Sequence, residues 1–293
     1  MAVSVHTLRA RVQHLFPPNE PLRGFVGATN YVLDKIHSKR RWSFNLAQSS
    51  FNTEAGYSTG TITATNGSTT ITGSGTTWTS TYENSYRIQI GDVQYSVVTV
   101  TNGTTIVIGE AFVGTTASGL TYQIYKTRYN IESNCQEVLR MWNGSTGIEM
   151  KTEDPILWGR GHFTQYATGD ALYYGLLGEN GVFTWKISLR PCPITTQIIQ
   201  YYYMKRRTPV TSVASSIDVP DHFTEMIVQG IYARYLQIKR VNGWRDEDNM
   251  FRELLSYKSA NDEPLADFTA FVPLRDGGYN IVGDRESTPI PAS

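Results

Sequence analysis

Apolar residues recur at intervals of three or four near both ends of the chain, and this spacing predicts four amphipathic helices. The first covers residues 4–16, begins at Ser4, a favoured N-cap residue, and is ended by a Pro-Pro pair. The second runs to the basic cluster at residues 39–41, where a helix dipole favours cations. The third and fourth cover 221–241 and 244–260, and an Asn-Gly pair separates them.

Between these ends the periodicity changes to two, which indicates strands that are solvated on one face. Residues 52–128 contain 20 Thr, no Pro and seven charged side chains. Thr favours strands, and Asn66-Gly67, Gly91-Asp92 and Asn102-Gly103 are turn pairs between alternating runs. We expect a small all-β sandwich or barrel of six or seven strands.

The remaining segments divide into a strand-rich stretch and a terminal arm. Ser133 with Gln136 three residues later is a capping-box pattern, and it predicts a short helix that ends at Asn143-Gly144. Aromatic runs between 145 and 205 favour strands. The final segment, 263–293, is rich in Pro and Gly and is expected to become ordered on a partner.

The fold class predicted from these patterns is α+β. Residues 1–51 and 129–262 would form a discontinuous, helix-dominated body, and 52–128 would be an inserted β domain. Residues 263–293 would form an extended C-terminal arm.

Charge balance argues against a free-standing nucleic-acid binder, because the 26 Lys and Arg equal the 26 Asp and Glu. The total conceals an asymmetry: residues 1–51 carry 7 − 2 = +5, and residues 263–293 carry 2 − 5 = −3. These basic residues would be ordinary solvated side chains or contacts to an acidic surface or a polyanion. The candidate positions for a channel-facing or inter-subunit basic patch are Lys39, Arg40, Arg41, Lys205, Arg206 and Arg207.

Motifs for catalysis, phosphate binding or metal binding are missing from the sequence, so we expect no enzyme, no cofactor and no metal site. His222 and Glu225 stand three apart on a predicted helix and could share a face as ligands, but two ligands are too few. The two cysteines lack metal-type spacing and indicate a reducing compartment. The sequence shows no apolar stretch long enough for a membrane span and no signal-peptide pattern. We therefore expect synthesis in a cytoplasm.

Three passages together resemble the head-to-tail adaptor, or connector, proteins of short-tailed bacteriophages. DVPDHFTEMIVQGIYARYLQ (218–237) with MFRELLSYK (250–258) resembles the closing helix pair of that family. RPCPITTQIIQYYYMKRRTPV (190–210) resembles the strand and crossover that precede the pair. The Thr-rich stretch from residue 60 to 131 is similar to the immunoglobulin-like insertion of some of these adaptors.

This resemblance implies a structural virion protein made in the host cytoplasm and located in the neck or tail. The implied partners are further copies of the chain in a ring, commonly twelve, the portal protein, and the tail nozzle or tube, with tail fibres as another candidate. Double-stranded DNA would pass through the channel without sequence-specific binding. The arm would bind the portal through Phe268, Phe271, Pro273 and Tyr279, since aromatic side chains dominate such contacts.

One alternative function is a fibre-like or receptor-binding module in which the β insertion binds carbohydrate. Trp78, Tyr82 and Tyr86 could stack on sugar rings, although a core position for Trp78 is favoured. A cell-wall hydrolase without a familiar motif is the third alternative.

Overall fold

The computed structural model describes residues 3–13, 22–153, 168–179, 182–212, 214–262, 271–273 and 279–281. It divides the chain into two compact units. One is formed by Met1–Ala47 together with Met204–Ser293, and the other by Gln48–Tyr203. The second unit is therefore inserted in the sequence of the first.

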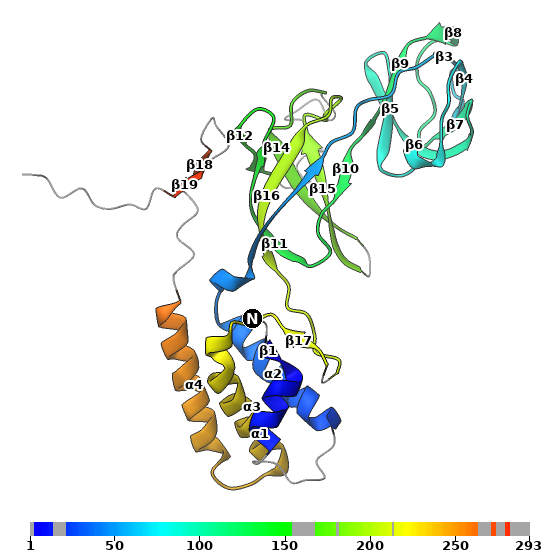
Figure 1. The fold of residues 1–293 in the computed structure, drawn as a ribbon. Helices are drawn as coiled ribbons and strands as arrows, with labels where there is room; N and C mark the ends of the chain where they lie inside the picture. The colour runs from blue at the N-terminus through cyan, green and yellow to red at the C-terminus, as the bar shows by residue number, and fades with distance from the viewer. Residues whose placement is uncertain are drawn as a thin grey trace, which may run out of the picture. The chain divides into compact units, whose positions relative to one another are not determined.

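The first unit contains the four α-helices of the described chain (Figure 1). They are α1 Val5–Val12, α2 Leu22–Lys39, α3 Thr224–Lys239 and α4 Trp244–Asn261. The Ser4 hydroxyl accepts a hydrogen bond from the Thr7 amide at 3.0 Å, as expected for an N-cap. All four predicted helices are confirmed, with ends that differ by a few residues.

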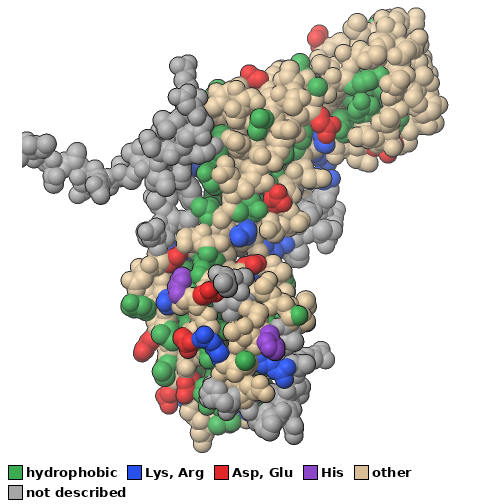
Figure 2. Space-filling view, in the orientation of Figure 1, with side chains coloured by type: hydrophobic (Ala, Val, Ile, Leu, Met, Phe, Trp, Pro, Cys, Tyr) green, Lys and Arg blue, Asp and Glu red, His purple; other side chains and the backbone are tan. Residues whose placement is uncertain are grey.

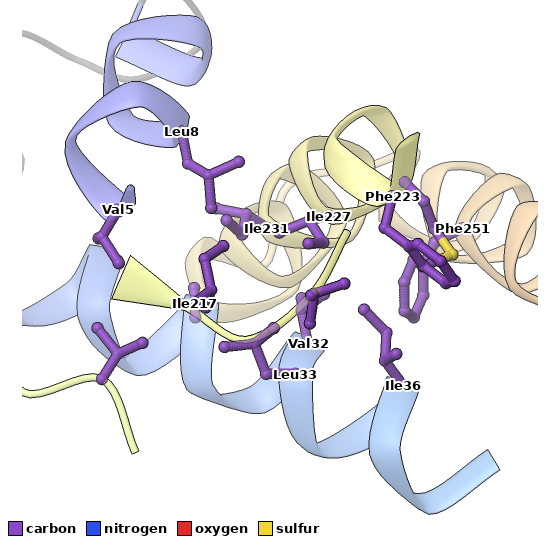
Figure 3. Packing of buried hydrophobic residues seen from close by; sticks show 14 of the residues in the cluster. Val5, Leu8, Val32, Leu33, Ile36, Ile217, Phe223, Ile227, Ile231 and Phe251 are labelled. Carbon is purple, nitrogen blue, oxygen red and sulfur yellow. The ribbon is translucent and has the colours of Figure 1, made fainter. Parts of the chain in front are cut away.

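A single apolar cluster joins these helices although they come from opposite ends of the chain. The side chains labelled in Figure 3 converge from α1, α2, α3, α4 and the short strand β17, Ser216–Ile217. Trp42 is fully buried in the same cluster, and its indole Nε1 donates to the Ile36 carbonyl oxygen at 2.6 Å. Its ring contacts Phe44 and Phe223, with centroids 5.7 and 5.2 Å apart. Trp42 therefore packs the end of α2 against the start of α3.

The closest approach of three helices occurs at Gly230 in α3. A Cβ atom at this position would lie 2.8 Å from Phe251 of α4 and 2.9 Å from Val32 of α2. Such distances are shorter than van der Waals contact, so the packing requires glycine here. Gly27 on α2 differs, because a Cβ atom there would meet nothing within 4 Å.

The second unit contains a seven-stranded antiparallel sheet with the order β8-β3-β4-β7-β6-β5-β9. Its strands are β3 Thr61–Ala64, β4 Thr70–Ser74, β5 Tyr86–Ile90, β6 Val93–Asn102, β7 Thr105–Ile108, β8 Ala117–Leu120 and β9 Tyr122–Lys126. Strands β8 and β9 are the two ends of this order and are separated in the chain only by Thr121; β8 pairs with β3, and β9 pairs with β5. Because the two end strands follow one another directly, the sheet curls round into an open barrel (Figure 1).

The three predicted hairpin turns are confirmed by the register of this sheet. Ile90 pairs with Val93 across Gly91-Asp92, and Asn102 pairs with Thr105. Gly67 and Gly91 have positive φ angles of 76° and 61°, which glycine adopts without steric cost. Apolar side chains fill the interior, including Trp78, which is 3% exposed.

Two four-stranded sheets complete the second unit, with orders β10-β15-β14-β13 and β12-β11-β16-β2. Their strands are β2 Leu46–Asn52, β10 Arg128–Asn130, β11 Cys135–Asn143, β12 Ile148–Glu149, β13 Lys151–Thr152, β14 Tyr173–Glu179, β15 Val182–Arg190 and β16 Ile198–Lys205. The chain passes between the units within β2 and again within β16, which are neighbours in one sheet. Adjacent crossing points are what an inserted unit needs. Outside these sheets, β1 Val3–Ser4 pairs with β17, and β18 Phe271–Pro273 pairs with β19 Tyr279–Ile281.

A line of aromatic rings runs from the barrel to the sheet that holds β2 and β16. The Lys126 ammonium lies 5.5 Å from the Tyr86 ring centroid and 5.4 Å from that of Tyr129. Tyr129 stacks on Phe51 at 5.3 Å, and Phe51 contacts Tyr201 at 6.2 Å.

Glu54 anchors this line at the base of the barrel. Its carboxylate accepts hydrogen bonds from Lys126, at 2.5 Å, and from the Tyr86 hydroxyl. Burial alone would raise the pKa of Glu54, but these two hydrogen bonds hold it below its ordinary value.

The predicted helix-dominated fold class is wrong, because the described residues contain more strand than helix, 37% against 30%. The predicted helix at 133–142 is strand β11, which pairs with β12 and neighbours β16. This pairing supplies the backbone hydrogen bonds that a helix would have formed locally. The all-β character of 52–128 is confirmed, and an immunoglobulin-like form of this domain stays a prediction.

We predict that Gly230→Ala destabilises the helical unit by about 1–3 kcal/mol, because the added methyl group overpacks a three-helix contact. Gly27→Ala is the matched control and should stabilise it by up to about 1 kcal/mol, since alanine favours an exposed helix interior. Urea unfolding followed by helical circular dichroism at 222 nm measures both. Equal effects of the two substitutions would contradict the packing described here.

Candidate interaction surfaces

The candidate basic residues do not all face outward. Arg40 lies just after α2, and its guanidinium donates hydrogen bonds to the backbone carbonyl oxygens of Ser259 and, at 3.4 Å, Asp262. The Asp262 carboxylate lies 4.0 Å away. Arg40 therefore satisfies carbonyl groups at the C-terminus of α4, where a cation is favoured.

Arg207 is also held within the helical unit. Its guanidinium lies 2.6 Å from the Asp34 carboxylate and donates to the Asn30 side-chain oxygen at 2.7 Å. Asn30 in turn accepts from the Val210 amide at 2.9 Å and donates to the Val210 carbonyl oxygen at 2.8 Å. These contacts hold the crossover after β16 against α2.

The other candidate basic residues differ in exposure. Lys39 and Arg41 are exposed at the end of α2, and Lys205 and Arg206 are half-buried. A channel-facing or inter-subunit role for this group stays a prediction.

The candidate arm residues lie at the edge of what the structure describes. The backbone of Phe271, Pro273 and Tyr279 forms the β18–β19 hairpin, in which Pro273 pairs with Tyr279. Phe268 lies outside the described residues. A portal-binding role of the arm stays a prediction.

A cationic face that the sequence did not reveal lies on α2 and α3. Tyr31 and Lys35 are one turn apart on α2, and the Lys35 ammonium is 5.5 Å from the Tyr31 ring centroid. Arg234 of α3 lies on the same ring at 4.1 Å. Lys39 follows one turn beyond Lys35. We call Tyr31, Lys35, Lys39 and Arg234 the α2 face.

The outward side of α4 has the opposite character. Asp246, Met250, Glu253 and Tyr257 are spaced at helical intervals and are all exposed, with Met250 at 53% and Tyr257 at 65%. We call these four residues the α4 stripe. Figure 2 shows acidic and hydrophobic side chains together along the edge of the helical unit where Figure 1 draws α4.

A shallow hollow of about 390 Å³ lies between α1 and the start of α3. Within it, Arg11 and Glu225 form an ion pair at 2.5 Å, but both side chains are more than half exposed, so the pair adds little stability. His222, the ligand candidate, packs its ring on Phe223 at 4.6 Å. The hollow is lined by Ser4, Thr7, Arg11, Asp221, His222, Thr224 and Glu225.

Among the described residues no group of three or more His, Cys, Asp or Glu side chains could hold a metal ion. Cys135 and Cys192 are buried, and burial raises the pKa of the Cys192 thiol to about 11. No helix within the described ranges is long and apolar enough to span a membrane.

His37 of α2 is a half-buried group whose protonation is unfavourable. Its Nδ1 donates to the Leu33 carbonyl oxygen at 2.8 Å, and its Nε2 is buried without a hydrogen-bond partner among the described residues. Burial is the main cause that lowers the pKa of His37. The hydrogen bond to the Leu33 carbonyl oxygen raises this pKa, and the positive charge of Arg207 lowers it further.

We predict that the helical unit loses stability as the pH falls below the ordinary histidine pKa of 6.5. The unfolded chain then binds a proton at His37 that the folded chain resists. Urea unfolding at pH 7.5 and 5.5 should show a smaller loss for His37→Gln than for the unaltered protein. The other histidines are present in both proteins, so their contributions to the loss of stability cancel in this comparison. An equal loss of unfolding free energy in both proteins would contradict the prediction.

We also predict that Asn30→Ala lowers the free energy of unfolding by about 2 kcal/mol, because it removes hydrogen bonds to Val210 and Arg207. Lys39→Ala, exposed on the same helix, should change it by less than about 0.5 kcal/mol. Unfolding followed at 222 nm distinguishes the two. A mild effect at Asn30 would mean that the crossover is held by other contacts.

Comparison with known proteins finds no family model that matches the chain. No curated protein matches it significantly.

Proposed function

We propose that this protein is a structural virion component, a head-to-tail adaptor that assembles as a ring between the portal and the tail. The proposal rests first on the resemblance of three sequence passages to that family. Two of the passages fall on an antiparallel helix pair, α3 and α4, and on a strand with its crossover, β16 to β17. These are the elements that the resemblance implies at those positions.

The observation that carries the proposal furthest is the way in which the two ends of the chain meet. Helices α1 and α2 pack on α3 and α4 in one core, although a β-rich unit of more than 150 residues separates them in sequence. The resemblance implies a body built from both chain ends with a β insertion, predicted at 52–128; the β-rich unit found here is longer and also contains residues 129–203. The C-terminal segment follows α4 directly, where the implied portal-binding arm begins.

The carbohydrate-binding alternative is not favoured by any observation of the barrel. Trp78 and Tyr86 are 3% and 5% exposed, and the Trp78 indole donates to the Tyr122 hydroxyl at 3.1 Å inside the barrel. Buried rings of this kind stabilise the core and cannot stack on a sugar.

The proposal predicts that the protein forms a discrete high-mass complex with the portal protein of the same virion. Size-exclusion chromatography with light scattering measures the mass, and electron microscopy shows whether the complex is a ring. The protein alone and the portal alone are the controls. A mixture that elutes as two separate species would argue against an adaptor.

Removal of residues 263–293 should leave a folded protein that no longer joins the portal, because the apolar cluster of the described residues is formed by elements that end with α4. Circular dichroism and unfolding confirm the fold, and the same chromatography measures binding. A truncated protein that binds the portal with unchanged affinity would place the contact elsewhere.

A further inference from the structure

We infer that the α4 stripe of one copy docks on the α2 face of a second copy, head to tail. This inference rests on the proposed function for its setting, and it names the surfaces through which copies of the chain meet. It is argued below from the charge, exposure and spacing of the two surfaces.

The α4 stripe has the pattern of a helix that contacts another protein surface. Its acids, Asp246 and Glu253, are seven residues apart, and so are its apolar residues, Met250 and Tyr257. A seven-residue repeat keeps each kind of side chain on one line along a helix. The buried side of α4, with Phe251 and Leu255, already packs on α2 and α3. The repeat is therefore not needed for the core of the same chain.

Two exposed apolar side chains that alternate with two acids along α4 indicate a partner that is cationic and offers an apolar surface. Burial of apolar surface stabilises a protein by roughly 25 cal/mol for each Å² removed from water, and an exposed apolar side chain lacks this stabilisation. Met250 and Tyr257 are both more than half exposed. Association with a matching surface would recover this free energy.

The α2 face offers that chemistry within the same unit. Lys35, Lys39 and Arg234 are its cations, and the Tyr31 ring between Lys35 and Arg234 is an apolar surface. Gly27 lies one turn before Tyr31, and its missing side chain leaves the helix backbone open to close approach. A second copy is thus a partner of the required charge and shape.

Charge also determines the geometry of the contact. Two α4 stripes facing each other would bring acids together, and two α2 faces would bring cations together, so a two-fold symmetric pairing through either surface is unfavourable. The favourable contact joins different surfaces of successive copies. Contacts of this type produce closed rings or open filaments.

The test uses full-length protein with charges reversed on one surface at a time. One variant is Asp246→Lys with Glu253→Lys, and the other is Lys35→Glu with Lys39→Glu. We expect each variant alone to self-associate at least tenfold more weakly than the unaltered protein in sedimentation velocity at low salt. Each reversed surface would meet an unaltered surface of the same sign.

Mixing the two variants supplies the sharper outcome. The lysine stripe of one variant then faces the glutamate face of the other, and the two unaltered surfaces also match. We expect the equimolar mixture, and a single chain carrying all four reversals, to recover the self-association of the unaltered protein. Recovery by the chain with all four reversals is not produced by a change of net charge, because its net charge equals that of the unaltered protein, nor is it produced by loss of folding.

Two matched controls reverse exposed charges in the β-rich unit, Asp92→Lys and Lys151→Glu. They should leave association unchanged, and thermal unfolding should confirm that every variant is folded. Either reversed pair that associates like the unaltered protein, or a mixture that stays dissociated, overturns the inference. An unaltered protein that remains monomeric at every concentration, alone and with portal, also overturns it.

The inference and the proposed function fail in distinguishable ways. Portal complexes that form equally well with all variants would leave the adaptor role standing and refute the α4–α2 contact. Loss and recovery of self-association without any binding to portal would support the contact and refute the adaptor role.

Discussion

The helical unit depends on the contact of α2, α3 and α4 around Gly230, where there is no room for a further carbon atom. Phe251 and Val32 reach the same point on α3 from segments more than 200 residues apart in sequence. Overpacking at such a point shifts whole helices, because the side chains around it are close-packed. The path of the rest of the chain allows α2 to pack against α3 and α4. In particular, β2 and β16 carry the chain out of the helical unit and back on neighbouring strands.

Local signals were sufficient to predict the helices and the hairpin turns. The helices have caps and periodic apolar faces, and the turns in the Thr-rich region have Asn-Gly or Gly-Asp pairs, so short stretches of sequence contain the information. The helix prediction around Ser133 is wrong for the opposite reason. Its capping box is a local pattern, whereas strand β11 is stabilised by pairing with β12 and β16, and that pairing depends on residues far along the chain. The same long-range pairing produced more strand than the helix-dominated prediction allowed.

Surface properties were harder to predict than elements. Counting charges by segment identified a basic N-terminal block but could not show that Arg207 is paired with Asp34, 173 positions away in sequence. Nor could it show that Arg234 shares a ring with Lys35, because that contact requires α2 and α3 to be packed together. The seven-residue spacing on α4 was visible in the sequence. Its significance became clear only when the opposite side of the helix was found in the core.

The line of aromatic rings from Tyr86 to Tyr201 has a mechanical consequence. The barrel is joined to the rest of its unit by two chain segments. At that junction Glu54 accepts hydrogen bonds from Lys126 and Tyr86, and the ring contacts continue from Tyr129 to Phe51 of β2 and Tyr201 of β16. If the two segments were flexible linkers, a sideways force on the barrel would only rotate it and would not reach the sheet. The ring contacts and the partly exposed Glu54–Lys126 ion pair instead tie the barrel to β2 and β16, so a pull on the barrel is passed on to the sheet that contains these strands.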